Sequence, residues 1–292
     1  MRSTVSYPLW PRTSTMRSTP ACLSVLAALS AASVAAQAPL TAGATAGAVK
    51  LTDQRSEQAL TGVVQYQASP WLSLSAMPSV VHVSDMVSGR SVSSSGAGDL
   101  PVSAAALHAF ASPGAAVIAA ALTFVLPVGN AACGLGSGNT SLGLDVGAAV
   151  SPSRRLHLSA DASRSVSGLS AQSALSAPHA TSLRADAGYD VSSRWRASAS
   201  LGADVGAADS TQALSRVVGA GAGYRLAAPF TLTLDGSIGL SAASPKWALS
   251  LGIGTAFAGT SPVSLSSPLR RLKTTFAGGV NRGSGGGKIG CR

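Results

Sequence analysis

The chain has 292 residues, of which 46% are hydrophobic and only 11% are charged. This composition excludes an intrinsically disordered protein. Beyond residue 37, serine, glycine, aspartate and arginine interrupt every apolar stretch before it reaches the length of about eighteen residues that a helical membrane span needs. A chain that is apolar on average and polar at every second residue is typical of strands that face two different solvents.

The formal net charge of +10 is unevenly distributed along the chain. Residues 1–37 have three basic residues (Lys and Arg) and no acidic ones (Asp and Glu). Residues 38–258 have 12 basic and 11 acidic residues, and residues 259–292 have six basic and no acidic ones. The central part is almost neutral and therefore lacks the basic face of a nucleic-acid binder. We expect no nucleic-acid partner.

The N-terminus has the features of an export signal. Arginines without any acid precede an apolar run from Ala21 to Ala36, which ends in small residues before Gln37. This pattern predicts a signal peptide over residues 1–37, with translation starting at Met1 or at Met16. A short N-terminal membrane anchor is the alternative.

Alternation of apolar and polar residues predicts strands along the rest of the chain. Eleven segments fit this pattern, and an even strand number requires one more segment before them, for which only residues 44–53 are available. In chain order we expect strands over 44–53, 60–68, 71–83, 99–110, 115–127, 140–150, 155–167, 180–191, 194–206, 213–226, 229–241 and 246–257.

Residues 115–127 are the most ambiguous of these segments. They are apolar on both faces and rich in alanine, so a buried helix is the alternative. We favour a strand because the segment occupies a strand's place in a series of regular length.

The connections between the expected strands alternate in length. Short ones lie near residues 69–70, 112–114, 151–153, 192–193 and 227–229, and longer ones near 84–97, 128–139, 168–179, 206–212 and 242–246. Outer-membrane barrels have short periplasmic turns and longer external loops. The fold class that we predict is therefore all-β, a transmembrane antiparallel up-and-down β-barrel of about 12 strands over residues 38–258. A soluble β-sandwich or barrel is the alternative.

Residues 259–292 form a basic tail that is rich in serine, proline and glycine. We expect it to be periplasmic and mostly disordered, with a short helix near residues 269–276 as an alternative. In this topology Cys133 in a loop and Cys291 in the tail end on opposite sides of the membrane, so we expect no intramolecular bridge between them.

Three short motifs resemble a known family. They are Gly98-Asp99-Leu100, the segment from Leu126 to Gly138 with its Pro127-Val128-Gly129-Asn130 turn, and Ser244-Pro245-Lys246-Trp247. Together they make residues 60–258 similar to the outer-membrane proteins grouped under the MetA pathway of phenol degradation, a transporter-like family. The resemblance implies a barrel that passes small molecules, apolar or aromatic ones among them.

We assign no catalytic, cofactor-binding or metal-binding residue. The loop Gly134–Gly138 lacks the last glycine of a dinucleotide fingerprint and precedes a strand, and Gly283–Ile289 has isoleucine where a Walker loop needs Ser or Thr. His157 with Asp161 is the best candidate catalytic pair, but residues i and i+4 of a strand lie about 13 Å apart.

The polar faces of the expected strands carry charged residues that we predict to line the lumen. They either line a water-filled conduit or pair across the barrel and close it. The predicted lumen-lining residues are Asp145, His157, Asp161, Arg184, Asp186, Arg196, Asp204, Arg225 and Asp235, and Asp190 lies on the same face.

From the sequence we expect a passive channel for small molecules in the outer membrane of a Gram-negative bacterium, not an enzyme. Its partners would be outer-membrane lipid, the barrel-assembly machinery, which reads a C-terminal strand such as 246–257, and a small-molecule permeant that the sequence does not name. The first alternative is a closed structural or assembly barrel whose basic tail binds a periplasmic partner. The second is a barrel hydrolase that uses His157.

Overall fold

The computed structural model describes residues 40–110, 116–167, 181–205, 214–227 and 229–255. All of them belong to the second of the two units into which the chain divides, Ala38–Arg292. The expected signal peptide and the expected tail lie outside the described residues.

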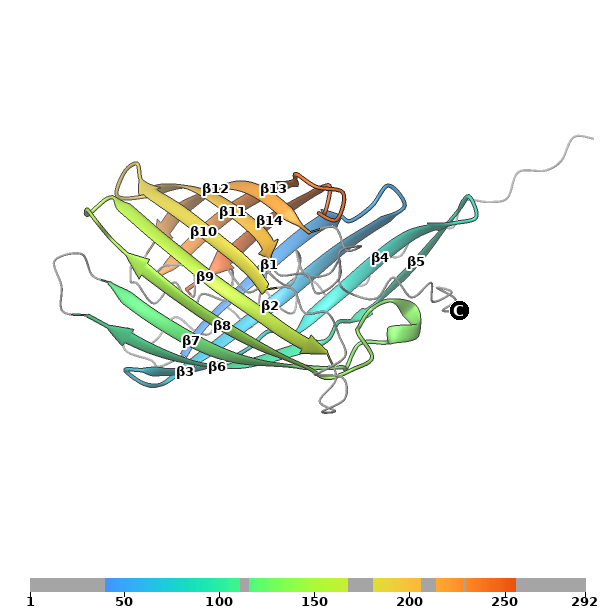
Figure 1. Cartoon of the computed structure of the whole chain (residues 1–292), viewed down its shortest axis with the longest axis horizontal. Coiled ribbons are helices and arrows are strands. Elements are labelled where there is room, and N and C mark those ends of the chain that lie inside the picture. The colour runs from blue at the N-terminus through green and yellow to red at the C-terminus, as the bar shows by residue number, and fades with distance from the viewer. Residues whose placement is uncertain (1–39, 111–115, 168–180, 206–213, 228, 256–292) are drawn as a thin grey trace, which may run out of the picture. The chain divides into compact units, whose positions relative to one another are not determined.

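The described residues are almost entirely β-strand (Figure 1). The strands are β1 (Leu40–Lys50), β2 (Arg55–Ser69), β3 (Leu72–Ala76), β4 (Ser79–Val87), β5 (Arg90–Ala97), β6 (Leu100–Ala109), β7 (Val117–Leu126), β8 (Ser141–Val150), β9 (Leu156–Ser167), β10 (Thr181–Asp190), β11 (Trp195–Val205), β12 (Arg216–Ala227), β13 (Phe230–Gly239) and β14 (Trp247–Gly254).

These segments form one closed antiparallel barrel of twelve strands. Fourteen segments give twelve strands because β3 with β4, and β5 with β6, are single long strands that are each interrupted once. The barrel closes where β1 pairs with β14, from Gly43 opposite Gly254 to Lys50 opposite Trp247. The predicted fold class and strand number are confirmed.

The first interruption falls at Met77 and Pro78. Proline has no N–H to donate to a neighbouring strand, but its carbonyl still accepts a hydrogen bond from the Gly62 N–H at 2.9 Å. The Met77 N–H donates to the Pro101 carbonyl at 3.0 Å, so β3 and β4 stay in the same wall.

The prediction of a long loop over residues 84–97 is wrong. These residues finish β4 and form β5, which pair as a hairpin from Val80 opposite Ala97 to Val87 opposite Arg90. Ser88 and Gly89 make the turn with φ of 52° and 77°, the backbone of the tight turn that suits the twist of a hairpin. The segment was missed because its serines show no apolar alternation. Figure 1 shows the hairpin extending beyond the neighbouring strands.

Residues 117–126 form strand β7 rather than a helix, as we favoured.

The tight connections after β2, β8, β10 and β12 lie at one end of the barrel with the start of β1 and the end of β14. The β4–β5 hairpin and the connection after β7 lie at the other end. We call these the short-turn end and the long-loop end.

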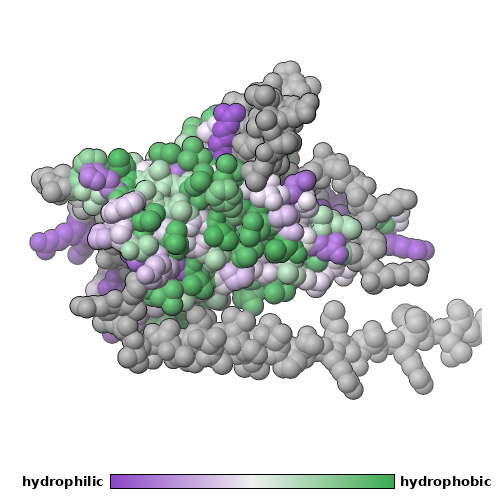
Figure 2. Space-filling view, turned by 90° about the horizontal axis from the view of Figure 1, so that it is seen from below, coloured by the Kyte–Doolittle hydropathy of each residue, from purple (hydrophilic) through white to green (hydrophobic). Residues whose placement is uncertain are grey.

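The two faces of the wall differ in chemistry. Large apolar side chains are exposed on one face of nearly every strand, among them Leu144, Leu158, Leu183, Leu201, Leu234 and Leu249. The buried apolar strand residues lie on the other face, which the antiparallel registers place inside. This is the inverse of a soluble barrel, whose polar face points outward. Figure 2 shows the outer apolar side chains gathered across the middle of the face in view, with hydrophilic residues toward both ends.

Aromatic side chains collect at the short-turn end. Tyr224 stacks on Trp195 with ring centroids 4.7 Å apart, and Trp195 is exposed on the outer face. The described aromatic residues at this end are Tyr66, Trp71, Phe110, Tyr189, Trp195, Tyr224 and Phe230. Such a belt is typical of a barrel's membrane interface. Among the residues that the structure describes, no helix is long and apolar enough to cross a membrane.

An outward charge tests this arrangement. Leu251 is half-exposed on the outer face and pairs with Leu234 and Ala46 near the middle of the barrel. In a bilayer we expect Leu251→Arg to lower the free energy of unfolding by about 2–4 kcal/mol, because a guanidinium at the midplane is costly. Urea titration in lipid vesicles measures this, and Leu251→Ala controls for lost packing. Equal stability of the arginine and alanine variants would contradict an outer face in lipid.

Candidate functional site

Strand alternation puts the residues that the sequence predicts to line the lumen on the face of the wall opposite the exposed apolar side chains. Each is separated from the exposed apolar face by strand alternation, and the registers align them across neighbouring strands. Arg184 lies opposite Asp161, Ser182 opposite Asp204, and Arg196 opposite Asp190. The inner face therefore brings charged groups from β8 to β13 together.

The first ion pair lies within β10. The Arg184 Nη2 and Nε atoms donate to both carboxylate oxygens of Asp186 at 2.8–3.0 Å. The two side chains are 13% and 21% exposed, so neither is released into bulk water. On the same strand, the Ser182 hydroxyl donates to Asp204 of the neighbouring β11 at 2.6 Å.

A second cluster lies at the short-turn end and joins three strands and a turn. Arg196 donates to the two oxygens of Asp190 at 2.6 and 3.0 Å, and His157 Nε2 lies 3.0 Å from the same carboxylate. His157 Nδ1 lies 2.9 Å from the hydroxyl of Ser151. The histidine's observed carboxylate contact is thus with Asp190, the residue across the sheet, and not with Asp161, the partner considered from the sequence.

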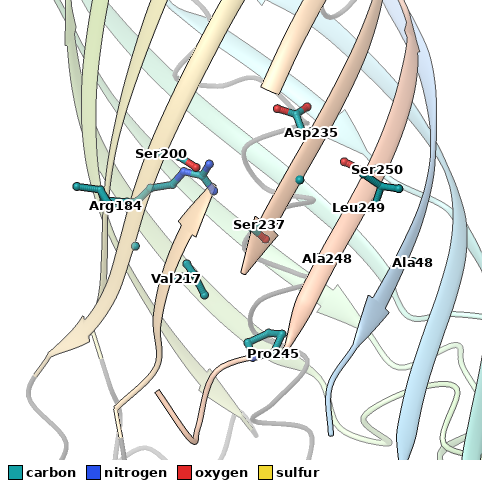
Figure 3. A pocket seen from close by; sticks show the side chains of 13 residues that line it. Ala48, Arg184, Ser200, Val217, Asp235, Ser237, Pro245, Ala248, Leu249 and Ser250 are labelled. Carbon is teal, nitrogen blue, oxygen red and sulfur yellow. The ribbon is translucent and has the colours of Figure 1, made fainter. Parts of the chain in front are cut away.

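A hollow opens on the inner wall between β10 and β14. It is small, with a cavity volume of about 60 Å³. Its lining is mixed, with Arg184, Asp235, Ser200, Ser237 and Ser250 beside the apolar Leu201, Val217, Pro245 and Leu249. Figure 3 shows these side chains on adjacent strands. The surface that lines the hollow is more apolar than polar, and charged and hydroxyl groups border it alongside the apolar side chains.

At the long-loop end, Asp99 anchors the connection between β7 and β8. Its carboxylate accepts hydrogen bonds from the Gly129 N–H at 3.1 Å and the Ser137 N–H at 2.7 Å, and the residue is 5% exposed. A Cβ atom on Gly136 would lie 2.3 Å from Asp99 Oδ1, so only glycine allows this approach. The acid lies in the break between β5 and β6.

The anchored loop folds against the inner face of the barrel. It contains a short 3₁₀ turn, Ala131–Cys133, and its Cys133 and Leu135 are buried against Val81 and Val83 of β4. Both valines lie on the inner side of the wall, since they pair with Ala59 and Glu57 of β2. The loop thus covers part of the lumen wall rather than extending away from it.

Cys133 is disulfide-bonded. The expectation that Cys133 and Cys291 form no bridge stays a prediction. The partner cysteine lies outside the described residues.

The last sequence motif closes the wall beside the seam. The Ser244 hydroxyl lies 2.6 Å from the Arg216 carbonyl and 2.7 Å from the Arg216 N–H, and Ser244 is 5% exposed. Lys246 pairs with Asp53 in the turn after β1, and its hydrogen bond lowers the pKa of the Asp53 carboxyl. This pair is exposed to solvent and stabilises the fold little.

The sequence analysis did not predict that the carboxylates of Asp99 and Asp190 each accept hydrogen bonds from several groups. Asp99 follows Gly98 in the sequence, and the glycine-rich segment 129–138 that it binds is distant in the sequence, so only the folded loop brings the two together. The signal for Asp190 was its position on the face shared with Arg196. No group of three or more His, Cys, Asp or Glu side chains able to hold a metal ion is found within the described part of the chain.

The comparisons with known proteins give a structural likeness only. No family matches the sequence, and no curated protein matches it either. An outer-membrane channel from Pseudomonas putida F1 has the same fold, with a TM-score of 0.59, 16% identity, and coverage of 75% of this chain and 96% of that one. The KdgM porin in complex with oligogalacturonate has a TM-score of 0.48 and 7% identity, covering 73% of this chain and 97% of that one.

Replacing the loop anchor tests its role. We expect Asp99→Asn to destabilise the barrel by about 1.5–3 kcal/mol, because an amide cannot accept charge-assisted bonds from both N–H groups. Denaturant unfolding and protease cleavage within residues 128–139 measure the effect. Asp53→Asn is the matched control, since its carboxylate is exposed at the same end. Equal unfolding free energies and equal cleavage of the two variants would contradict the role of Asp99 as the anchor of this loop.

Proposed function

We propose that this chain is a passive channel for small molecules in the outer membrane of a Gram-negative bacterium. In this proposal residues 1–37 direct export and are removed, the barrel-assembly machinery inserts the barrel, and the short-turn end with its aromatic belt faces the periplasm. The exposed apolar outer face supports lipid as the surrounding solvent.

The observation that carries the proposal is the set of charged residues that the registers align on the inner side of β8 to β13. A barrel with a purely structural role would be expected to fill its interior with packed side chains, as eight-stranded barrels do. Here Arg184, Asp235 and several serines border a small hollow in the wall, together with apolar residues such as Val217 and Leu249. We assign the predicted lumen residues to the lining of this conduit.

The inner face has two unlike halves, and this supports a permeant with both polar and apolar parts. Strands β8 to β13 present the charged residues, whereas Ala105, Val117 and Ala121 of β6 and β7 present buried apolar surface. A small aromatic molecule with a polar substituent would contact both halves. This agrees with the resemblance to the phenol-degradation family, to which we propose that the chain belongs.

The first alternative is a closed structural barrel, and the Arg184–Asp186 and Arg196–Asp190 pairs favour it, since paired charges can close a lumen. Its basic tail would bind an anionic periplasmic partner. Removal of residues 259–292 separates the two functions: lost partner binding with unchanged conductance would favour the structural barrel.

The second alternative is a hydrolase, and the contiguous Ser151, His157 and Asp190 contacts favour it. Against it, Arg196 donates two hydrogen bonds to the same carboxylate and competes for the charge that would stabilise a protonated imidazole. We expect no cleavage of ester, lipid or peptide substrates by the wild type, and a product whose formation His157→Ala abolishes would reverse this choice.

Planar-bilayer recording tests the channel directly. We expect a small, reproducible conductance from the refolded chain, and no current at any voltage would contradict the proposal. The inner face of β8 to β13 holds six Asp against three Arg, so the double variant Asp145→Asn and Asp235→Asn should lower the preference for cations over anions. Asp53→Asn, outside the lumen, should leave the reversal potential unchanged.

A further inference from the structure

The charged residues of the described barrel are separated along its axis. At the short-turn end, Asp190 is the one acid among the residues that the structure describes. The described basic residues at the same end are Arg154, Arg155, Arg194, Arg196 and Arg225. The rest of the inner face of β8 to β13 has the opposite excess, with five Asp against Arg184. The mouth of the lumen at the short-turn end is therefore basic, and the lumen beyond it is acidic.

The acid at this mouth is already neutralised. Asp190 accepts two hydrogen bonds from Arg196, at 2.6 and 3.0 Å, and its carboxylate lies 3.0 Å from His157 Nε2. Arg155 lies opposite Asp190, since the Asp190 N–H donates to the Arg155 carbonyl at 2.8 Å. The exposed Arg155 side chain makes no hydrogen bond or ion pair with any described residue. Its charge is thus left without a counter-charge in the described wall.

Arg194 and Arg225 lie opposite each other on neighbouring strands. Trp195 pairs with Tyr224, and one step nearer the turn the Arg225 N–H donates to the Arg194 carbonyl at 2.9 Å. Residues that lie opposite each other in a sheet share a face. Arg225 is also opposite Thr231, which is buried on the inner side of the wall. The register therefore puts both arginines on the inner side of the mouth.

This pair of arginines costs stability as it stands. Both side chains are exposed, and neither has a hydrogen-bond or ion-pair partner within the described part of the chain. Like charges directly opposite each other destabilise a sheet. Two opposed cations with no acid beside them point to a ligand that carries the missing negative charge.

We propose that Arg194, Arg225 and Arg155 form a binding site for a small dianion, a dicarboxylate or a phosphate ester, at the short-turn mouth of the lumen. A guanidinium presents two parallel N–H donors that match the oxygens of a carboxylate or a phosphate. Arg155 begins β9 and Arg194 precedes β11, two strands that lie about 10 Å apart across β10. Three cations around one ligand favour two negative charges over one.

The side of the wall favours a soluble ligand over a lipid headgroup. Trp195 is exposed on the outer face and stacks with Tyr224, so aromatic rings occupy the lipid side at this level. Arg194 and Arg225 are the next residues along the same strands and alternate to the other side. A ligand that enters the lumen from the short-turn end meets them directly.

Occupation of the site would change which ions pass, and this consequence rests on the proposed channel function. Charged side chains around a pore set its selectivity. Without ligand, the basic mouth repels the cations that the acidic lumen attracts. A bound dianion cancels most of the charge of the three arginines, so cations pass more readily.

Binding is tested without any current. Equilibrium dialysis of radiolabelled malonate against the full-length chain, refolded in non-ionic micelles at low salt, measures the affinity. We expect saturable binding that the double variant Arg194→Gln and Arg225→Gln weakens about tenfold, because each lost guanidinium removes hydrogen bonds to a charged group. The double variant Arg90→Gln and Arg164→Gln removes the same charge from the long-loop end and should bind like wild type. Equal affinity of all three proteins would overturn the site.

Two competitors identify the kind of ligand. Inorganic phosphate should displace malonate, whereas neutral malonamide should not. Phosphatidylglycerol added to the micelles should leave malonate bound, because the arginines face the lumen. Displacement of malonate by this lipid would show that the arginines bind headgroups, and it would overturn a site inside the mouth.

Bilayer recording tests the effect on ion passage. Malonate added to one chamber should shift the reversal potential of the wild type toward cation preference, and malonate in the other chamber should not. The variant of Arg194 and Arg225 should show the higher cation preference without malonate. A reversal potential that malonate does not move from either side would overturn the proposed effect. If no protein conducts, the channel function fails, while dialysis still decides whether the anion site exists.

Discussion

The closure of β1 onto β14 is the constraint on which the structure depends. In a bilayer core no water can satisfy an exposed backbone N–H or carbonyl, so a strand-built protein has to pair every strand on both sides. Eight residue pairs between Gly43–Lys50 and Trp247–Gly254 remove the two edges that an open sheet would leave. The neighbouring Lys246 N–H extends the seam with a hydrogen bond of 2.7 Å to the Lys50 carbonyl. Closure then gives each strand one face toward the surroundings and one toward the lumen.

Closure of the barrel leaves charged side chains on the inner face, and these side chains have partners within the wall. Charged side chains are held by partners on the same or the next strand, as Asp186 is by Arg184 and Asp190 by Arg196, so they keep defined positions. Asp99 uses a different solution, since two backbone N–H groups hold its buried carboxylate. These two hydrogen bonds hold the β7–β8 loop, whose Cys133 and Leu135 pack against Val81 and Val83 on the inner face.

The strands of the second half could be predicted closely from sequence, because alternation there is strict. The expected 194–206 and 229–241 correspond to Trp195–Val205 and Phe230–Gly239. Strand β5 could not be predicted, since RSVSSSGA has no apolar face and forms a strand only because β4 pairs with it. Period two fixes which face Asp190 occupies but not the register, so its contacts with His157 and Arg196 needed the structure. The packing of Cys133 and Leu135 on β4 needed the structure for a related reason, because loop length does not indicate whether a loop turns inward.

The most direct test of a membrane barrel is to find out whether the mature chain folds in water or only in detergent. Circular dichroism of residues 38–292, refolded with and without detergent micelles, measures this. The account predicts a β-sheet spectrum in micelles and aggregation without them. A monomer that folds in buffer alone, or a helical spectrum in micelles, would contradict it.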